Sequence, residues 1–156
     1  MILKYEFNKI EIKRSVIQSL CNYTQLNNTD KEAGGVLMGR VLINSDFIIS
    51  ANSEPQYRDT RSRCFFQKNK CDHQKIVNNY WKTSNGYINY LGEWHTHPES
   101  SPKPSLVDLE SWKHNLKLNK NEIYAHIFII VGTLEIGVWL GIKKTRKIIN
   151  VGYFNV

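Results

Sequence analysis

The stretch from Leu91 to Asp108, LGEWHTHPESSPKPSLVD, constrains the chain most because it spaces three candidate metal ligands. His95 and His97 are one residue apart, and Asp108 follows after ten intervening residues. Imidazole and carboxylate groups suit Zn²⁺, and a catalytic zinc takes three protein ligands while a fourth position stays open for water. The pattern therefore predicts a zinc site formed by His95, His97 and Asp108.

Local geometry supports this site. Tyr87–Trp94 is rich in aromatic and β-branched residues and predicts a strand, on which residues two apart project to the same face. The proline-rich segment Pro98–Pro104 predicts an ordered loop, and Asp108 then falls in the first turn of a helix. The apolar face of that helix would comprise Leu109, Trp112 and Leu116. At a helix N-terminus the dipole favours the ionised carboxylate that a metal needs.

Simpler interpretations exist for each piece. Ser105 and Asp108 fit a capping box, in which the serine is the N-cap and the acid is the third helical residue. A His-x-His pair at the end of a strand can equally be a surface pair or a hydrogen-bonded pair. The conjunction of all these residues in register favours the metal site, and capping and metal binding are compatible.

A family resemblance rests on the same residues. His95-Thr96-His97-Pro98, followed by Ser105 and Asp108, matches the pattern H-x-H-P-x6-S-x2-D and resembles the JAMM (MPN-plus) zinc metallopeptidases. The resemblance implies a zinc-dependent isopeptidase, commonly one that removes ubiquitin or a ubiquitin-like protein. It also implies a general base on an earlier strand and a serine, here Ser105, that helps to bind the oxyanion of the tetrahedral intermediate.

The sequence offers two candidates for the general base, Glu32 and Glu93. Glu32 precedes the glycine-rich run Gly34–Gly39, which looks like the glutamate strand of the family, so the resemblance assigns the base to Glu32. A solvent-exposed acid at the end of a polar loop is the simpler interpretation of Glu32. Glu93 competes, because strand alternation places it on the side of His95 and His97, where it could be a base, a fourth ligand or a partner that orients an imidazole. We assign Trp94 to the core.

The segment Gly92–Pro98 in a compact single domain more closely resembles the stand-alone prokaryotic JAMM proteins of CBASS antiphage systems. That resemblance implies cleavage of the bond after the C-terminus of a ubiquitin-like or similarly conjugated protein. The conjugated protein would be a cyclic-nucleotide synthase of bacterial antiviral defence, and a ubiquitin-conjugating-like protein would be an operon partner. The loops Pro55–Cys71 and Pro98–Lys103 would recognise the substrate.

Two rival functions share the same fold. A RadC-like, DNA-associated protein carries a similar histidine and aspartate string, but here Thr96 stands in place of asparagine and Glu99-Ser100 in place of Ser-Gly. A non-catalytic MPN interaction scaffold usually lacks the ligands, whereas this chain has all three. Chelator-sensitive cleavage of a ubiquitin-like fusion, rather than salt-sensitive DNA binding, would favour the peptidase.

The size of the chain, 156 residues, predicts one domain over residues 1–156. The longest apolar stretch, Ile127–Val131, is too short to cross a membrane, so we expect a cytoplasmic protein without a membrane partner. The three cysteines predict reduced thiols rather than a disulfide framework. A second, structural metal at Cys64, Cys71 and His73 is a weaker alternative.

Basic residues give the chain a net charge of +7 and are concentrated in Pro55–Lys75 and Lys143–Lys147. Such segments attract polyanions or acidic protein surfaces, although each lysine could simply be solvated. Aromatic residues do not alternate with these basic residues, as a single-strand groove would need, so a nucleic-acid partner is not expected.

The fold expected from periodicity is α/β. The predicted strands are Ile2–Phe7, Gly35–Ile43, Phe47–Ala51, Cys64–Gln67, Tyr87–Trp94, Tyr124–Val131, Leu134–Gly141 and Lys147–Phe154. The predicted helices are Arg14–Thr24, Asp72–Thr83 with Ile76, Val77, Tyr80 and Trp81 inward, and the segment that starts at Ser105. This order is similar to an MPN domain, a cytidine-deaminase-like α-β-α sandwich with a mixed sheet between helices.

Overall fold

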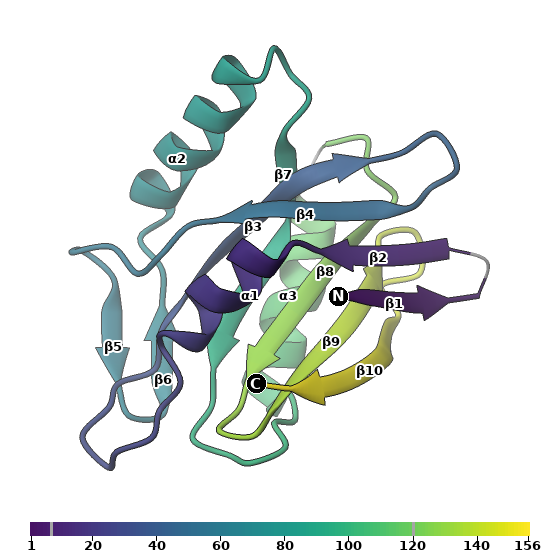
Figure 1. Ribbon diagram of the computed structural model, residues 1–156. Coiled ribbons are helices and arrows are strands. Elements are labelled where there is room, and N and C mark those ends of the chain that lie inside the picture. The colour runs from purple at the N-terminus through teal and green to yellow at the C-terminus, as the bar shows by residue number, and fades with distance from the viewer. Residues whose placement is uncertain (7, 120) are drawn as a thin grey trace.

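The chain forms one mixed eight-stranded sheet with helices on both faces (Figure 1), as seen in a computed structural model that describes residues 1–6, 8–119 and 121–156. The order across the sheet is β1-β2-β4-β3-β7-β8-β9-β10, and β5 and β6 form a separate hairpin. The strands are β1 (Ile2–Tyr5), β2 (Asn8–Ile12), β3 (Gly34–Val41), β4 (Phe47–Asn52), β5 (Thr60–Ser62), β6 (Phe65–Gln67), β7 (Asn89–Thr96), β8 (Ala125–Val131), β9 (Glu135–Ile142) and β10 (Ile148–Asn155). The helices are α1 (Arg14–Cys21), α2 (Lys70–Thr83) and α3 (Leu106–Leu118). The expected mixed sheet flanked by helices is confirmed.

Strand β7 and helix α3 belong to one β-α-β unit. β7 and β8 are parallel neighbours, and α3 is the crossover between them. Parallel neighbours need such a crossover, which brings the start of the helix close to the carboxyl end of the first strand. The topology therefore brings the end of β7 and the first turn of α3 together.

Two apolar cores form on opposite faces of the sheet. Strand β8 is buried throughout and supplies both: Ile127 and Ile129 belong to the larger core, whereas Phe128 and Ile130 belong to the smaller one. Helix α1 covers the larger core, and α3 lies on the opposite face over the smaller one (Figure 1). Strand alternation accounts for this division, because successive side chains of a strand point to opposite faces.

Most predicted elements are confirmed with shifts of a few residues at their ends. The expected strand Ile2–Phe7 is observed as β1, and Phe7 lies outside the described residues. Sequence analysis missed β2, which pairs with β1 as a hairpin, and β5, which pairs with β6. Both missed strands are short and carry polar residues, so they give little periodic signal.

The predicted inward face of α2 is wrong for Tyr80 and Trp81, whereas Ile76 and Val77 are half-buried. His73 is the only buried residue of this helix, all of which is described, whereas Trp81 is 54% exposed and Tyr80 is 38% exposed. Helix α2 contacts the two central strands, β3 and β7, but none of its apolar residues belongs to either core. A groove of about 410 Å³ opens between α2 and α3, and Trp81 lines it. Among the described residues, no helix is both long and apolar enough to cross a membrane.

Candidate metal centre and catalytic site

Three predicted ligands converge at the end of β7. The two imidazole Nε2 atoms of His95 and His97 lie 3.0 Å apart. Asp108 places Oδ1 3.2 Å from Nε2 of His95 and Oδ2 3.5 Å from Nε2 of His97. Both histidines are largely buried, and one ligand atom from each residue lies within 4.8 Å of the others. The structure therefore brings together the three side chains that the sequence singled out.

The spacing of these atoms fits a tetrahedral metal ion. Zinc bonds to nitrogen and carboxylate oxygen are about 2.0–2.2 Å long, so two ligand atoms at a tetrahedral angle lie about 3.3–3.6 Å apart. The two imidazole nitrogens lie 3.0 Å apart, and each lies 3.2 or 3.5 Å from a different oxygen of the Asp108 carboxylate, so the donor groups are close to that spacing. Two imidazoles and one carboxylate are also the donors of known catalytic zinc sites. The donor set and its geometry both fit a zinc ion.

The carboxylate is fixed by the start of α3. Ser105 is the N-cap of this helix, and its hydroxyl accepts the backbone N–H of Asp108 at 3.2 Å. The same hydroxyl donates to Oδ2 of Asp108 at 2.6 Å, and the backbone N–H of Ser105 donates to that oxygen at 2.7 Å. The expected capping box is confirmed, and it orients the candidate ligand at the same time.

Aromatic packing fixes the position of α3 on the sheet. The ring of Trp112 stacks on Phe128 of β8, with centroids 4.5 Å apart and planes 9° apart. It also contacts Trp139 of β9, and its edge approaches His95 with a centroid separation of 6.3 Å. One buried side chain thus ties the helix that carries Asp108 to the strands beside His95.

Electrostatics prepare the site for a cation. Burial alone would raise the pKa of Asp108, but hydrogen bonds with His95, His97 and Ser105 hold that pKa far below its ordinary value. Burial alone would lower the pKa of His97, but Asp108, Glu32 and Glu99 together raise it. The negative potential that favours a proton on His97 equally favours a metal cation.

Glu32 lies in the same pocket as the three candidate ligands. This pocket has a volume of about 600 Å³, and Ser105 also lines it. Glu32 is buried, and burial raises its pKa to about 7, with His97 lowering it and Asp108 and Glu99 adding to the rise. A carboxyl with a pKa near neutrality is suited to take and return a proton, and the simpler interpretation of an exposed acid is wrong.

Glycine in β3 lets the Glu32 segment approach the ligand strand. Gly34 is paired with His95, and a Cβ on it would lie 2.7 Å from the carbonyl oxygen of Trp94 and 2.5 Å from the ring of Phe66. Any larger residue would push β3 away from β7 or displace the β5–β6 hairpin. Glycine at this position therefore permits the close approach of β3 to β7.

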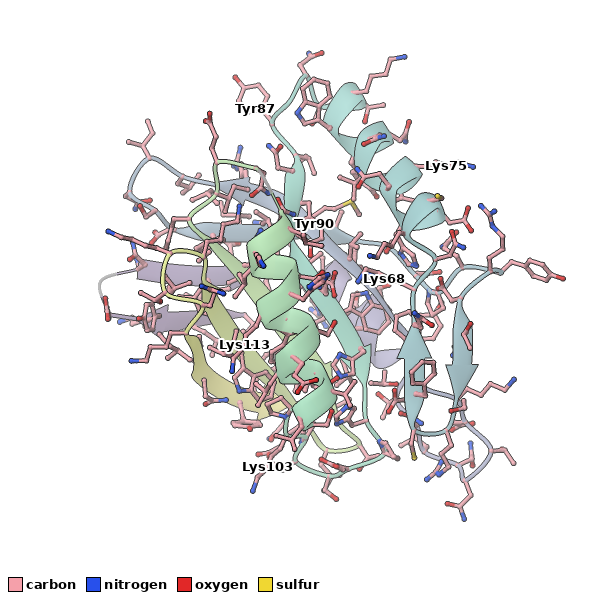
Figure 2. The ribbon with its side chains drawn as sticks, turned by 180° about the vertical axis from the view of Figure 1, so that it is seen from behind. Lys68, Lys75, Tyr87, Tyr90, Lys103 and Lys113 are labelled. Atoms are coloured by element: carbon pink, nitrogen blue, oxygen red, sulfur yellow. The ribbon has the colours of Figure 1, made fainter. Side chains whose placement is uncertain are left out.

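Glu93 bonds to residues other than the three candidate ligands. It forms an ion pair with Lys68 and accepts a hydrogen bond of 3.1 Å from the hydroxyl of Tyr90. Figure 2 shows Lys68 and Tyr90 on the face that carries α3, beside that helix. Glu93 lines the pocket of the candidate ligands but is not one of the three clustered groups. Of the two candidate bases, Glu32 is therefore the one that forms no ion pair with a lysine or arginine among the described residues.

Sequence analysis missed the task of Thr96, which lies between the two histidines and is fully buried. Its hydroxyl accepts the N–H of Ala33 at 3.0 Å and donates to Gln25 at 2.9 Å. The side chain does point away from the ligands, as alternation predicts, and Trp94 is in the core. Nothing in the local sequence marks Thr96 or Gln25, because each partner is distant in the chain.

Most of the basic segment Pro55–Lys75 makes contacts within the protein. Arg58 pairs with Asp72, Arg61 and Arg63 donate to backbone carbonyls, and Lys68 pairs with Glu93. His73 bonds to Ser53 and Asp59 rather than to a cysteine, with Nδ1 2.6 Å from the serine hydroxyl. The positive charge of this segment is therefore used largely to hold the hairpin in place.

Comparison with known proteins places the chain in a family. The model of prokaryotic homologues of the JAB domain matches residues 16–144. The chain belongs to this JAB family. Its resemblance to the JAMM enzymes, inferred from the His-x-His-Pro motif, is thereby confirmed.

Curated relatives of this JAB protein carry the name of an enzyme. A "CD-NTase/cGAS isopeptidase" of Escherichia coli is 37% identical over 90% of this chain and 89% of its own. A protein of the same name from Vibrio cholerae is 37% identical over 91% of this chain and 86% of its own. Among solved structures, a protein of Desulfitobacterium hafniense has a TM-score of 0.60 and 18% identity over 94% of this chain and 89% of its own, which shows the fold alone.

Proposed function

We propose that this JAB protein is a zinc-dependent isopeptidase that cleaves the bond after the C-terminus of a conjugated protein. The convergence of His95, His97 and Asp108 beside the buried Glu32 carries the proposal. The names of the relatives support a CD-NTase, a cyclic-nucleotide synthase, as the conjugated protein. Within CBASS antiphage defence, the enzyme would reverse the attachment made by a ubiquitin-conjugating-like partner.

Each candidate residue has a defined task in this reaction. His95, His97 and Asp108 would hold Zn²⁺, which supplies a Lewis acid for the scissile carbonyl and acidifies water. Glu32 would take the proton of the attacking water and deliver it to the leaving amine, for which its pKa of about 7 is suited. Burial keeps competing water away from this carboxyl and strengthens its interactions.

Ser105 would donate a hydrogen bond to the developing oxyanion. In the structure its hydroxyl donates to Asp108 instead. A rotation about one side-chain bond would redirect this donor, and the backbone N–H of Ser105 would still bond to the carboxylate. We therefore propose two tasks for Ser105, capping of α3 and stabilisation of the intermediate.

The test uses a CD-NTase fused through its C-terminal residue to green fluorescent protein. Purified protein loaded with one equivalent of Zn²⁺ should release the two parts, and Glu32→Gln should slow release by about 10²- to 10⁴-fold while zinc content is retained. His97→Ala should lose both zinc and cleavage. Cleavage at an unchanged rate by Glu32→Gln would refute the assignment of the base.

A further inference from the structure

The backbone of Glu32 is held from outside the main sheet. This residue lies in the loop before β3, where it is not part of a strand ladder. Its N–H donates to the carbonyl of Ser62 at 2.8 Å, and its carbonyl accepts a hydrogen bond of 2.6 Å from Nε of Arg61. A second nitrogen of the same guanidinium lies 3.3 Å from the carbonyl of Lys31. The planar fork of arginine thus contacts two successive carbonyls.

Arg61 belongs to the β5–β6 hairpin, which forms a separate two-stranded sheet in the described chain. The hairpin is anchored by buried polar groups rather than by strand pairing with β3. Asp59, just before β5, accepts the N–H groups of Gln56 and Asn69 at 2.6 Å each and lies 3.1 Å from Nε2 of His73. Such satisfied buried networks are rigid, so the base of the hairpin has a defined position.

The other side of the Glu32 segment is tied to the ligand strand. Ala33 and Thr96 exchange two hydrogen bonds, of 3.0 Å to the threonine hydroxyl and 2.8 Å between backbone groups. Gln25 links this side to the hairpin, because it accepts from Thr96 and donates to the carbonyl of Arg63 at 2.8 Å. The segment is therefore fixed between β7, which carries the histidines, and the hairpin, which carries Arg61.

We propose that Arg61 is a positioning residue for catalysis: its guanidinium fixes the backbone of Glu32 so that the carboxyl meets the water and the leaving amine. The inference rests on the proposed function, in which Glu32 is the general base. Removal of the guanidinium leaves the carbonyls of Lys31 and Glu32 without this donor, so the segment keeps its bonds to Ser62 and Thr96 but loses one of its restraints beside Glu32. Displacement of a catalytic group by about 1 Å can cost about 10²-fold in rate.

Arg63 provides a matched control on the same hairpin. It too is half-buried, and it too donates to the loop before β3, at 2.8 Å to the carbonyl of Asn27. Its contacts are with Asn27 and Asn28, which precede Glu32 in that loop by five and four residues. Loss of either arginine removes one charge and two hydrogen bonds to that loop, to the carbonyls of Glu32 and Lys31 for Arg61 and to the carbonyl of Asn27 and the side chain of Asn28 for Arg63. A general weakening of the hairpin would therefore affect both variants alike.

The experiment measures kcat and KM on the CD-NTase fusion for Arg61→Gln and Arg63→Gln, both loaded with zinc. For Arg61→Gln we expect kcat to fall by about 10- to 100-fold while KM and zinc stoichiometry stay within about twofold. For Arg63→Gln we expect kcat and zinc stoichiometry within about twofold, and any effect on substrate recognition by the Pro55–Cys71 segment should change KM alone. Arg61→Lys keeps a charged donor without the fork and should recover part of kcat. Equal losses in Arg61→Gln and Arg63→Gln would overturn the proposal.

A double-mutant cycle separates positioning from stability. In the Glu32→Gln background there is no base to position, so adding Arg61→Gln should lower kcat by less than about threefold. If the two losses instead multiply, Arg61 acts independently of Glu32 and the inference is wrong, although the proposed function stands. If Glu32→Gln alone keeps full turnover, the proposed base and the inference both fail.

Discussion

A buried carboxyl without a cationic partner carries a cost in stability. The Glu32 carboxyl accepts no hydrogen bond from the described residues, and burial raises its pKa to about 7 from an ordinary value of 4.5. The folded state then binds more protons than the unfolded state between these values, so stability falls as pH rises through this window. Active sites that bury a charged group commonly lower the stability of the protein while supporting its activity.

We therefore predict that Glu32→Gln stabilises the metal-free protein. At pH 8 the free energy of unfolding should rise by about 1–3 kcal/mol, and the decline between pH 4.5 and 7 should flatten. Urea unfolding of the metal-free protein at several pH values measures both effects. Glu110→Gln, a change at an exposed position of α3, is the control and should leave the decline intact. A less stable Glu32→Gln at pH 8 would contradict this account.

At this scale the three candidate ligands and the capping of Asp108 by Ser105 could be predicted, whereas the supports from distant segments could not. His95, His97 and Asp108 follow from strand alternation and from one helix start, both of which are local in sequence. The contacts from Thr96 to Ala33 and from Arg61 to Glu32 join residues 63 and 29 positions apart, and they depend on how distant segments pack. A pattern within one stretch carries no information about such partners.

Helix α3 joins the metal site to the fold through its first turn. We predict that Ser105→Ala lowers the free energy of unfolding by about 1 kcal/mol, as loss of an N-cap does, and lowers turnover by about 10²-fold with little loss of zinc. Ser105→Gly keeps a tolerated N-cap residue without a side-chain donor, so it should retain most of the stability but not the turnover. Full turnover in Ser105→Gly would show that the serine acts only as a cap.

The stacking of Trp112 on Phe128 makes the position of α3 sensitive to one side chain. Trp112→Ala should lower the free energy of unfolding by about 3–5 kcal/mol and weaken zinc binding, because the helix carries Asp108. Trp81→Ala is the control, since that exposed tryptophan on α2 should cost no more than about 0.5 kcal/mol. Denaturant unfolding and zinc titration measure the two effects, and a Trp112→Ala protein with wild-type zinc affinity would contradict the prediction.

Hydrophobic periodicity predicted where the helices lie better than it predicted which of their faces are buried. It located α3 and its buried Trp112 and Leu116 because their spacing matches one helical face. It failed for α2, whose apolar residues border a groove rather than the core, since the same spacing is compatible with either. Periodicity shows that a face is apolar, but only the packed structure shows what covers that face.

At the scale of the whole molecule, the net charge of +7 would attract DNA, so the RadC-like, DNA-associated alternative needs a test of its own. In the segment Lys143–Lys147, three basic residues are exposed, namely Lys144, Arg146 and Lys147. We predict only non-specific DNA binding, with a dissociation constant of about 10⁻⁴–10⁻⁶ M at physiological salt, that does not change when zinc is removed. Tighter, sequence-dependent binding to duplex DNA, measured by fluorescence anisotropy, would favour the rival function.

The central claim is that one zinc ion, held at the end of β7 and the start of α3, makes this JAB protein an isopeptidase. The most direct measurement is cleavage of the CD-NTase fusion by metal-free protein before and after addition of one equivalent of Zn²⁺. We predict no cleavage before the addition and full cleavage after it. Equal cleavage in the presence of a chelator, or no cleavage by folded protein that has bound zinc, would contradict the account.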